Sequence, residues 1–259
     1  MNKLKTIILS GGFGTRISEE TNLKPKPMIE VGGKPILWHI MKIYSFYGFN
    51  SFLVALGYKG DLIKKFFLEY IDYSGDISIL VKNKKKIITR KDFENWEIGL
   101  VDTGVNSNTG GRVKALKDYI GSNRFLCTYG DGVSNVNLKD LLKFHVEHRK
   151  LATVTAVRPP ARFGELLVDE KKKIVKFKEK PLKGDGWING GFMVFEPEVL
   201  NMIQDSSSSL ESELLENLSK ENQLSAYLHS DFWQCMDTKR DLNYLENLWS
   251  SGQAPWKLW

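Results

Sequence analysis

Glycines and cations near the start of this chain have the types and spacing needed to bind phosphate groups. The apolar run Ile7–Leu9 leads into Gly11–Arg16, which contains three glycines and ends in an arginine, and Lys26 follows between two prolines. Glycines allow backbone N–H groups to approach an anion closely, and nearby cations neutralise its charge. The pattern therefore predicts a buried strand that ends in a phosphate-binding loop.

The spacing of this loop excludes two common phosphate-binding motifs. A P-loop requires a Lys followed by Ser or Thr after its last glycine, and no such pair follows here. A dinucleotide-binding loop requires a third glycine where this chain has Ile17. Glycines alone could mark an ordinary turn between a strand and a helix, but Arg16 and Lys26 in the same segment favour a nucleoside triphosphate.

Two aspartates follow predicted strands and could hold one metal ion. Asp131 comes after the apolar run Phe125–Tyr129, and Asp237 comes after Phe232–Met236. In open α/β sheets, ligands gather outside the carboxyl ends of the strands. Mg²⁺ binds a few carboxylates together with substrate oxygens and water, so both aspartates are candidate Mg²⁺ ligands. The alternatives are a Gly-Asp-Gly turn for Asp131 and a helix N-cap for Asp237.

The assembled motifs resemble those of the sugar-phosphate nucleotidyltransferase family over almost the whole chain. The motifs concerned are Gly11–Arg16, Lys24–Met28, Gly130–Gly132, Glu179–Pro181 and Asn189–Gly191. The resemblance implies a Rossmann-like nucleotide-diphospho-sugar transferase fold, with a mostly parallel central sheet flanked by helices and a smaller β-rich sugar-binding part. It also implies Mg²⁺ dependence and a homo-oligomer, plausibly a hexamer.

The resemblance assigns expected roles to individual residues. Arg16, Lys26 and Asp131 are the expected catalytic residues, and Asp131 and Asp237 the expected metal ligands. The expected nucleotide-binding residues are Leu9, Gly11, Gly12, Gly14, Thr15, Arg16, Lys26, Thr109, Gly111, Arg112, Gly130 and Asp131. The expected sugar-phosphate-binding residues are Gly164, Glu179, Lys180 and Asn189. For Arg112 an exposed helix arginine remains an alternative, as does a solvated loop lysine for Lys26.

Further segments resemble the cytidylyl branch of the family, which implies CTP and glucose 1-phosphate as substrates. They include Ser18–Thr21, Val101–Gly104, Thr109–Arg112 and Ala254–Lys257. Alternatives are the same reaction with dTTP or UTP or with another sugar 1-phosphate, and a catalytically silent regulatory subunit that binds nucleotide sugars. A glycosyltransferase would explain neither the glycine loop nor Lys26.

The elements that must position these residues alternate along the chain. Strand-length apolar runs and helix-period segments follow one another from Thr6–Leu9 through helix Ile36–Tyr47 to helix Leu62–Tyr70. This alternation predicts a parallel sheet wrapped by helices. The centre of the chain is rich in predicted strands, and a last helix begins near Lys239. We expect a single domain spanning 1–259, since no linker or repeat interrupts the pattern.

Composition limits the remaining classes of function. The net charge of +6 arises largely from Lys82–Lys91 and Lys171–Lys180, neither of which has the interleaved aromatic residues of a single-strand nucleic-acid binder. Apolar runs are too short to cross a bilayer, and Met1–Ser10 lacks the features of a secretory signal. Cys127 and Cys235 lack metal-ligand spacing and are expected to be reduced. We therefore expect a cytoplasmic protein that binds neither nucleic acid nor membrane.

Overall fold

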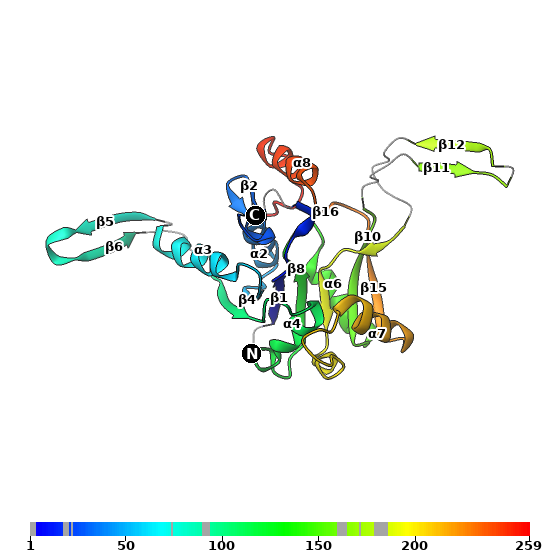
Figure 1. Cartoon of the computed structure of the whole chain (residues 1–259), viewed down its shortest axis with the longest axis horizontal. Coiled ribbons are helices and arrows are strands. Elements are labelled where there is room, and N and C mark those ends of the chain that lie inside the picture. Colours follow the sequence, from blue (N-terminus) through cyan, green and yellow to red (C-terminus); the bar gives the residue numbers. More distant parts are fainter. Residues whose placement is uncertain are drawn as a thin grey trace.

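The fold is built around one mixed β-sheet, seen in the computed structural model of the chain (Figure 1). The structure describes residues 4–17, 21, 23–73, 75–89, 94–159, 165–170, 172–178 and 186–259. Along the sheet the strand order is β13-β10-β14-β8-β1-β4-β7, and β15 also pairs with β10. The strands are β1 (Lys5–Ser10), β4 (Ser51–Leu56), β7 (Glu97–Asp102), β8 (Phe125–Tyr129), β10 (Ala152–Val157), β13 (Ile188–Asn189), β14 (Met193–Phe195) and β15 (Leu224–His229).

Strand direction divides the sheet into two parts. Strands β8, β1, β4 and β7 are mutually parallel, whereas β14 runs antiparallel to β8 and β10 antiparallel to β14. In the parallel part, Leu9 of β1 lies beside Tyr129 of β8 and Ala55 of β4. The carboxyl ends of β1 and β8 therefore meet at one edge, as the glycine loop requires.

Apolar side chains alternate between the two faces of the sheet, as the two-residue period of a strand dictates. Ile8 and Val54 contribute to one core, with helices α2 (Ile36–Phe46), α3 (Gly60–Tyr73), α6 (Leu138–His148) and α8 (Lys239–Ser250). Ile7 and Leu53 contribute to the other core, with α4 (Thr109–Ala115), α5 (Lys117–Ile120) and α7 (Glu216–Lys220). Both faces are thus covered, which explains the continuous apolar runs of the central strands.

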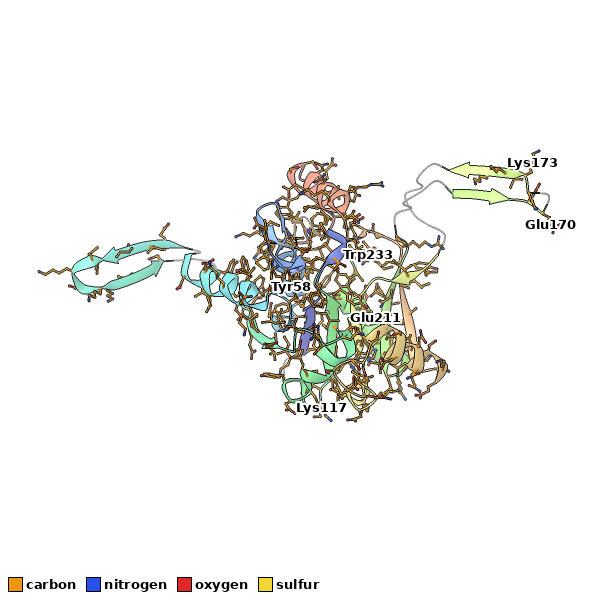
Figure 2. All side chains as sticks on the ribbon, viewed as in Figure 1. Tyr58, Lys117, Glu170, Lys173, Glu211 and Trp233 are labelled. Atoms are coloured by element: carbon orange, nitrogen blue, oxygen red, sulfur yellow. The ribbon has the colours of Figure 1, made fainter. Side chains whose placement is uncertain are left out.

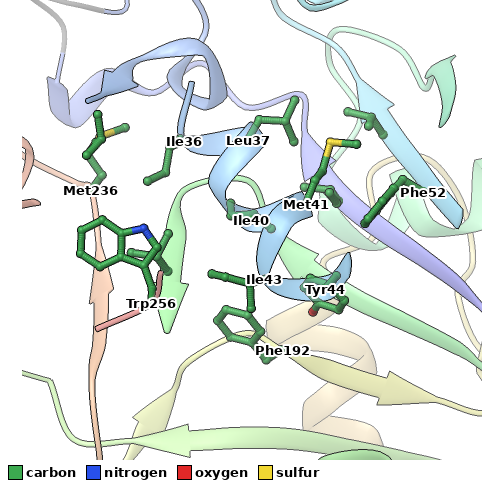
Figure 3. Packing of buried hydrophobic residues seen from close by; sticks show 14 of the residues in the cluster. Ile36, Leu37, Ile40, Met41, Ile43, Tyr44, Phe52, Phe192, Met236 and Trp256 are labelled. Carbon is green, nitrogen blue, oxygen red and sulfur yellow. The ribbon is translucent and has the colours of Figure 1, made fainter. Parts of the chain in front are cut away.

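Helix α2 forms the centre of the first core (Figure 3). Its buried side chains, from Ile36 to Tyr44, pack against Phe192 and against Trp256 near the end of the chain. Tyr44 and Phe192 stack with their ring centroids 5.8 Å apart. The helix thereby connects the glycine-loop half of the sheet to the segment that carries Asn189–Gly191.

Two hairpins extend from the body as arms on opposite sides (Figure 1). One pairs β5 (Asp76–Leu80) with β6 (Lys85–Thr89), and the other pairs β11 (Glu165–Val168) with β12 (Ile174–Lys178). Two further short pairings are described, formed by β2 (Glu30–Val31) with β3 (Lys34–Pro35), and by β9 (Gly132–Ser134) with β16 (Trp233–Cys235). In the described part of the chain, no helix has the length and apolar character needed to cross a membrane.

Several predicted elements match the structure, and a few differ. The predicted strands β1 and β8 and the predicted helix α2 are present within one residue, and α8 begins at Lys239 as predicted. The segment that begins at Thr109 forms two short helices, α4 and α5, and Asn108 caps the first. The region Leu210–Leu215 is a π-helix, which precedes α7.

Candidate active site

A cavity of about 670 Å³ opens where β1 and β8 end. Its walls come from the glycine loop, the end of β8 and the beginning of α4. Ten of the expected nucleotide-binding residues line it: Leu9, Gly11, Gly12, Gly14, Thr15, Lys26, Thr109, Arg112, Gly130 and Asp131. The cavity is therefore bordered by the glycine loop and by the Gly130-Asp131 turn, both of which the sequence indicated as parts of the site.

Two glycines at the cavity, Gly14 in the glycine loop and Gly130 after β8, leave no space for a side chain. Gly14 has a φ of +65°, and a Cβ there would lie 2.7 Å from the Thr21 methyl carbon. The Gly130 amide donates to the Leu9 carbonyl at 3.0 Å, and a Cβ on Gly130 would lie 2.8 Å from that oxygen. Only glycine fits these positions without displacing the loop.

Arg16 follows this loop in the short helix Thr15–Ile17. Its side chain lies outside the described part of the structure, so its expected contact with the triphosphate stays a prediction.

Lys26 and the two aspartates meet at the edge of the cavity. The Lys26 ammonium donates to Asp131 Oδ2 and to Asp237 Oδ1, each at 2.6 Å. The Met236 amide donates to the Asp131 carbonyl at 2.9 Å, which holds β16 against the turn after β8. The backbone thus brings together carboxylates that are far apart in the sequence.

The electrostatics of this group favour a permanent positive charge on Lys26. Burial alone would lower the pKa of Lys26, but the charges of Asp131 and Asp237 and their hydrogen bonds raise it above the ordinary value. Cys235 lies beside the same group, and burial followed by the nearby carboxylates raises the pKa of its thiol to about 12. The thiol therefore stays protonated at neutral pH and is not a nucleophile.

Asp237 does not serve as a helix cap. The N-cap of α8 is Thr238, whose hydroxyl accepts from the Asp241 amide in a capping box. Asp237 is 8% exposed and directs one carboxylate oxygen to Lys26. The capping alternative considered from the sequence is therefore wrong.

The two aspartates suit a cation that completes its shell with ligand oxygens. Both already contact one ammonium group, so both can contact one positive centre. Among the described residues, no group of three or more His, Cys, Asp or Glu side chains could hold a metal ion. At this position Asp131 and Asp237 offer two carboxylates, and substrate and water would supply the other oxygens of a bound cation.

Arg112 holds the loop through main-chain carbonyls. Its guanidinium donates to the carbonyls of Gly11, Leu56 and Gly104, at 3.0, 3.0 and 2.7 Å. A Cβ on Gly11 would lie 2.2 Å from the guanidinium carbon, so a glycine at this position is needed to leave space for the Arg112 side chain. The exposed-arginine alternative is excluded because Arg112 is buried; its expected contact with a nucleotide stays a prediction.

Gly111 lies outside the cavity lining and has a packing role. Its amide donates to the Ser208 carbonyl at 3.1 Å, and a Cβ on Gly111 would lie 2.2 Å from the Ser206 carbonyl oxygen. Gly111 thus lets α4 approach the 206–210 segment.

The expected sugar-phosphate residues are only partly described. Gly164, Glu179 and Lys180 lie outside the described residues, and their roles stay predictions. Asn189 is in β13, where its amide Nδ2 donates to the Tyr129 hydroxyl at 3.2 Å. Its Oδ1 accepts from the Gly191 amide at 3.0 Å. Because Tyr129 lines the cavity, Asn189 lies just behind the cavity wall.

Sequence reasoning missed Tyr129, which lines the cavity, and Glu211, which contacts it. The Tyr129 hydroxyl donates to Glu211 Oε1 at 2.7 Å. Tyr129 could have been found from its position directly before the Gly130-Asp131 turn. Glu211 offered no comparable signal, since it is one of several acidic residues in a segment that reads as a surface helix.

Together, the fold and this cavity define an α/β protein with a candidate ligand site at the carboxyl ends of parallel strands. The chain belongs to the nucleotidyl transferase family, whose model matches residues 5–248.

Among curated relatives, this chain is 48% identical to the glucose-1-phosphate cytidylyltransferase of Salmonella typhi, over 99% of this chain and 100% of the relative. It is 42% identical to the probable glucose-1-phosphate cytidylyltransferase of Bacillus subtilis, with the same coverage. It is 28% identical to the mannose-1-phosphate guanylyltransferase catalytic subunit beta of Dictyostelium discoideum, over 95% of this chain and 64% of that protein.

Solved structures share the fold at low identity. HddC from Yersinia pseudotuberculosis, complexed with GMP-PN, is similar with a TM-score of 0.69 and 22% identity, over 95% of this chain and 99% of that chain. A putative glucose-1-phosphate thymidylyltransferase from Bacillus anthracis is similar with a TM-score of 0.66 and 19% identity, over 95% of this chain and 94% of that chain. These likenesses confirm the predicted α/β fold class.

Proposed function

We propose that this chain transfers a cytidylyl group from CTP to α-D-glucose 1-phosphate and releases pyrophosphate. The two bacterial relatives with 48% and 42% identity carry the name of this activity over their full lengths. The observation that carries the proposal is the meeting of Lys26, Asp131 and Asp237 at the edge of a glycine-lined cavity.

In the proposed reaction, a phosphate oxygen of glucose 1-phosphate attacks the α-phosphorus of CTP. The new O–P bond forms as the bond between the α-phosphorus and the bridging oxygen to the β-phosphorus breaks, and pyrophosphate takes that electron pair. The attacking oxygen is already ionised at neutral pH, so the chain needs no nucleophilic side chain. Its task is to align two polyanions and to offset their charge.

Each part of the cavity has a role in this alignment. The Gly11–Gly14 loop offers its backbone to the triphosphate, and Arg16 is assigned to the departing pyrophosphate. Lys26, whose raised pKa keeps it charged, is assigned to the phosphates of both substrates. Removing one such preorganised donor typically lowers the rate by about 10²–10³.

We assign Asp131 and Asp237 as the protein ligands of Mg²⁺. The ion would neutralise charge on the α-phosphate and hold both substrates' oxygens in line. The support is chemical: two carboxylates converge on one cationic position, and the remaining ligands are oxygens of the kind that a triphosphate supplies. With an ion on the two carboxylates, the Lys26 ammonium would be available to contact the substrate phosphates.

We propose that the chain works as a homo-oligomer, with a hexamer as the size implied by the family resemblance. The β5–β6 arm supports self-association because it exposes Ile79, Leu80 and Val81, the last of them 80% exposed. A lone two-stranded hairpin is marginally stable in water, so a partner surface would stabilise it.

We further propose one domain and a cytoplasmic location, which suits both a CTP-consuming reaction and two free cysteines.

A substrate panel tests the proposed function. CTP, dTTP, UTP, GTP and ATP are each offered with glucose 1-phosphate or mannose 1-phosphate in Mg²⁺, and pyrophosphate release is measured. We expect CTP with glucose 1-phosphate to be preferred. Preference for another pair would overturn the cytidylyl assignment, and binding of CDP-glucose without any turnover would favour the regulatory subunit.

A further inference from the structure

Glu211 accepts hydrogen bonds from two residues that line the cavity, Thr109 and Tyr129. Its Oε2 accepts from the Thr109 hydroxyl at 2.6 Å, and its Oε1 accepts from the Tyr129 hydroxyl at 2.7 Å. Tyr129 in turn accepts from the Asn189 amide at 3.2 Å. A single carboxylate thus lies at the centre of a chain of hydrogen bonds that runs from α4 to β13. Glu211 is in the body of the molecule, far from the two arms (Figure 2).

The backbone around Glu211 is arranged to hold this carboxylate in place. Glu211 is in the π-helix Leu210–Leu215, a geometry often found at functional sites. The Leu210 amide donates to the Thr109 hydroxyl at 2.9 Å, so Thr109 both accepts from this segment and donates to it. Gly110 permits the contact, because a Cβ there would lie 2.8 Å from the Ser208 carbonyl.

The direction of each hydrogen bond in the chain is fixed. A carboxylate accepts hydrogen bonds, so the Tyr129 hydroxyl donates to Glu211. The Tyr129 oxygen then accepts from Asn189, whose Oδ1 accepts from the Gly191 amide. Loss of the negative charge at Glu211 would free both Tyr129 and Thr109 to rotate.

We propose that Glu211 is a positioning residue that sets the Thr109 side chain for the nucleotide and, through Tyr129, the Asn189 side chain for the sugar phosphate. This inference rests on the proposed transferase function and extends it to a residue that joins the two substrate subsites. In this role, the Glu211 carboxylate affects the affinity of the chain for both substrates.

Four variants separate this role from a merely structural one. Glu211→Gln keeps the shape and removes the charge. Thr109→Val breaks the nucleotide branch, and Tyr129→Phe breaks the sugar branch. Glu216→Gln is the matched control, since it removes an exposed carboxylate from the following turn. For each variant, KM for both substrates, kcat and the unfolding temperature are measured with the substrate pair that the unaltered chain uses fastest.

We expect Glu211→Gln to raise KM for both substrates, by about tenfold or more, since hydrogen bonds to a charged group are lost. Thr109→Val should raise KM chiefly for the nucleotide, and Tyr129→Phe chiefly for the sugar phosphate. The double variant Glu211→Gln with Tyr129→Phe should raise the sugar-phosphate KM no further than Glu211→Gln does alone. Glu216→Gln should change neither constant.

A lower unfolding temperature in Glu211→Gln with both KM values unchanged would overturn the proposal and leave the transferase function intact. Additive effects in the double variant would also overturn it. A preference of the unaltered chain for other substrates would correct the substrate assignment alone, and an unaltered chain without turnover would overturn the proposed function itself.

Discussion

Lys26 shows what the identity of a residue predicts and what only the fold supplies. Its flanking prolines and its distance from the glycine loop predicted a directed cation near phosphates. Its contacts with Asp131 and Asp237 could not be predicted, because they join positions 105 and 211 residues away. The residue types predicted the chemistry of the site, and β-strand pairing determines which of those residues meet.

Asp131→Asn and Asp237→Asn should each lower turnover by about 10²–10³, since each removes one of two carboxylate charges from the site. Triphosphate affinity should fall less, because the glycine loop is unchanged. Pyrophosphate release and CTP binding are measured side by side. Asp118→Asn, at an exposed position of α5, is the control. An unchanged rate in either site variant would contradict the shared-metal assignment.

Arg112→Lys should destabilise the chain even without substrate. Lysine cannot reproduce the guanidinium fork, so the buried carbonyls of Gly11 and Leu56 lose their donor. Unsatisfied buried groups cost about 1–3 kcal/mol each, so the free energy of unfolding should fall by about that amount or more. Urea unfolding without nucleotide measures it. If Arg112 served the nucleotide alone, unfolding would be unchanged and only CTP affinity would fall.

At the scale of elements, the sequence predicted the strands whose carboxyl ends form the site, and missed those that do not show a strong apolar run. β1, β4 and β8 are buried on both faces and read as continuous apolar segments. β15 alternates apolar and polar residues, a signal that the surrounding polar turns obscured. The π-helix has no signature in residue type, and its contact with α4, through the Leu210 amide and the Thr109 hydroxyl, joins positions about 100 residues apart.

Helix α6 contributes a histidine whose environment predicts a pH effect on stability. Burial, followed by the positive charge of Arg124, lowers the pKa of His145 from 6.5 to about 4. Its Nε2 contacts Glu196 at 3.3 Å, and its Nδ1 contacts the Thr153 hydroxyl at 2.8 Å, which His148 also contacts. Between these two pKa values the unfolded chain binds a proton that the folded chain does not. The contribution of His145 to the free energy of unfolding is therefore fully present above pH 6.5 and is lost as the pH is lowered toward 4.

His145→Gln should reduce this pH dependence by up to about 1.4 kcal/mol per pH unit within that window. The free energy of unfolding in urea is measured from pH 4.5 to 7 for both chains. His39, whose pKa burial also lowers to about 4, should preserve part of the slope in the variant. Identical slopes with and without His145 would show that the histidine does not contribute.

For the whole molecule, the arms contrast with the closely packed body. The β5–β6 arm places Ile79 and Val81 in solvent, 67% and 80% exposed, whereas the central strands β1, β4 and β8 bury their large aliphatic side chains. Such exposure has a physical reason only if another surface covers it. The sequence indicated an oligomer through resemblance alone, since the apolar residues of a short strand do not reveal whether the chain itself covers them.

Ile79→Asp combined with Val81→Asp should reduce the mass of the particle, because charge in a buried contact is costly. Sedimentation velocity at several protein concentrations measures the mass. Val146→Asp, at an apolar position 48% exposed on the body, is the control and should leave the mass unchanged. Equal masses for the arm variant and the unaltered chain would exclude the arm as the contact.

The central claim is that a glycine loop, two cations and two aspartates act on one nucleotide, and a crystal structure with Mg²⁺ and a non-hydrolysable CTP analogue tests it most directly. We expect the triphosphate to lie along Gly11–Arg16, with the ion bound by both Asp131 and Asp237 and Lys26 turned to the phosphates. Phosphates bound elsewhere, or an ion held by neither aspartate, would contradict the account.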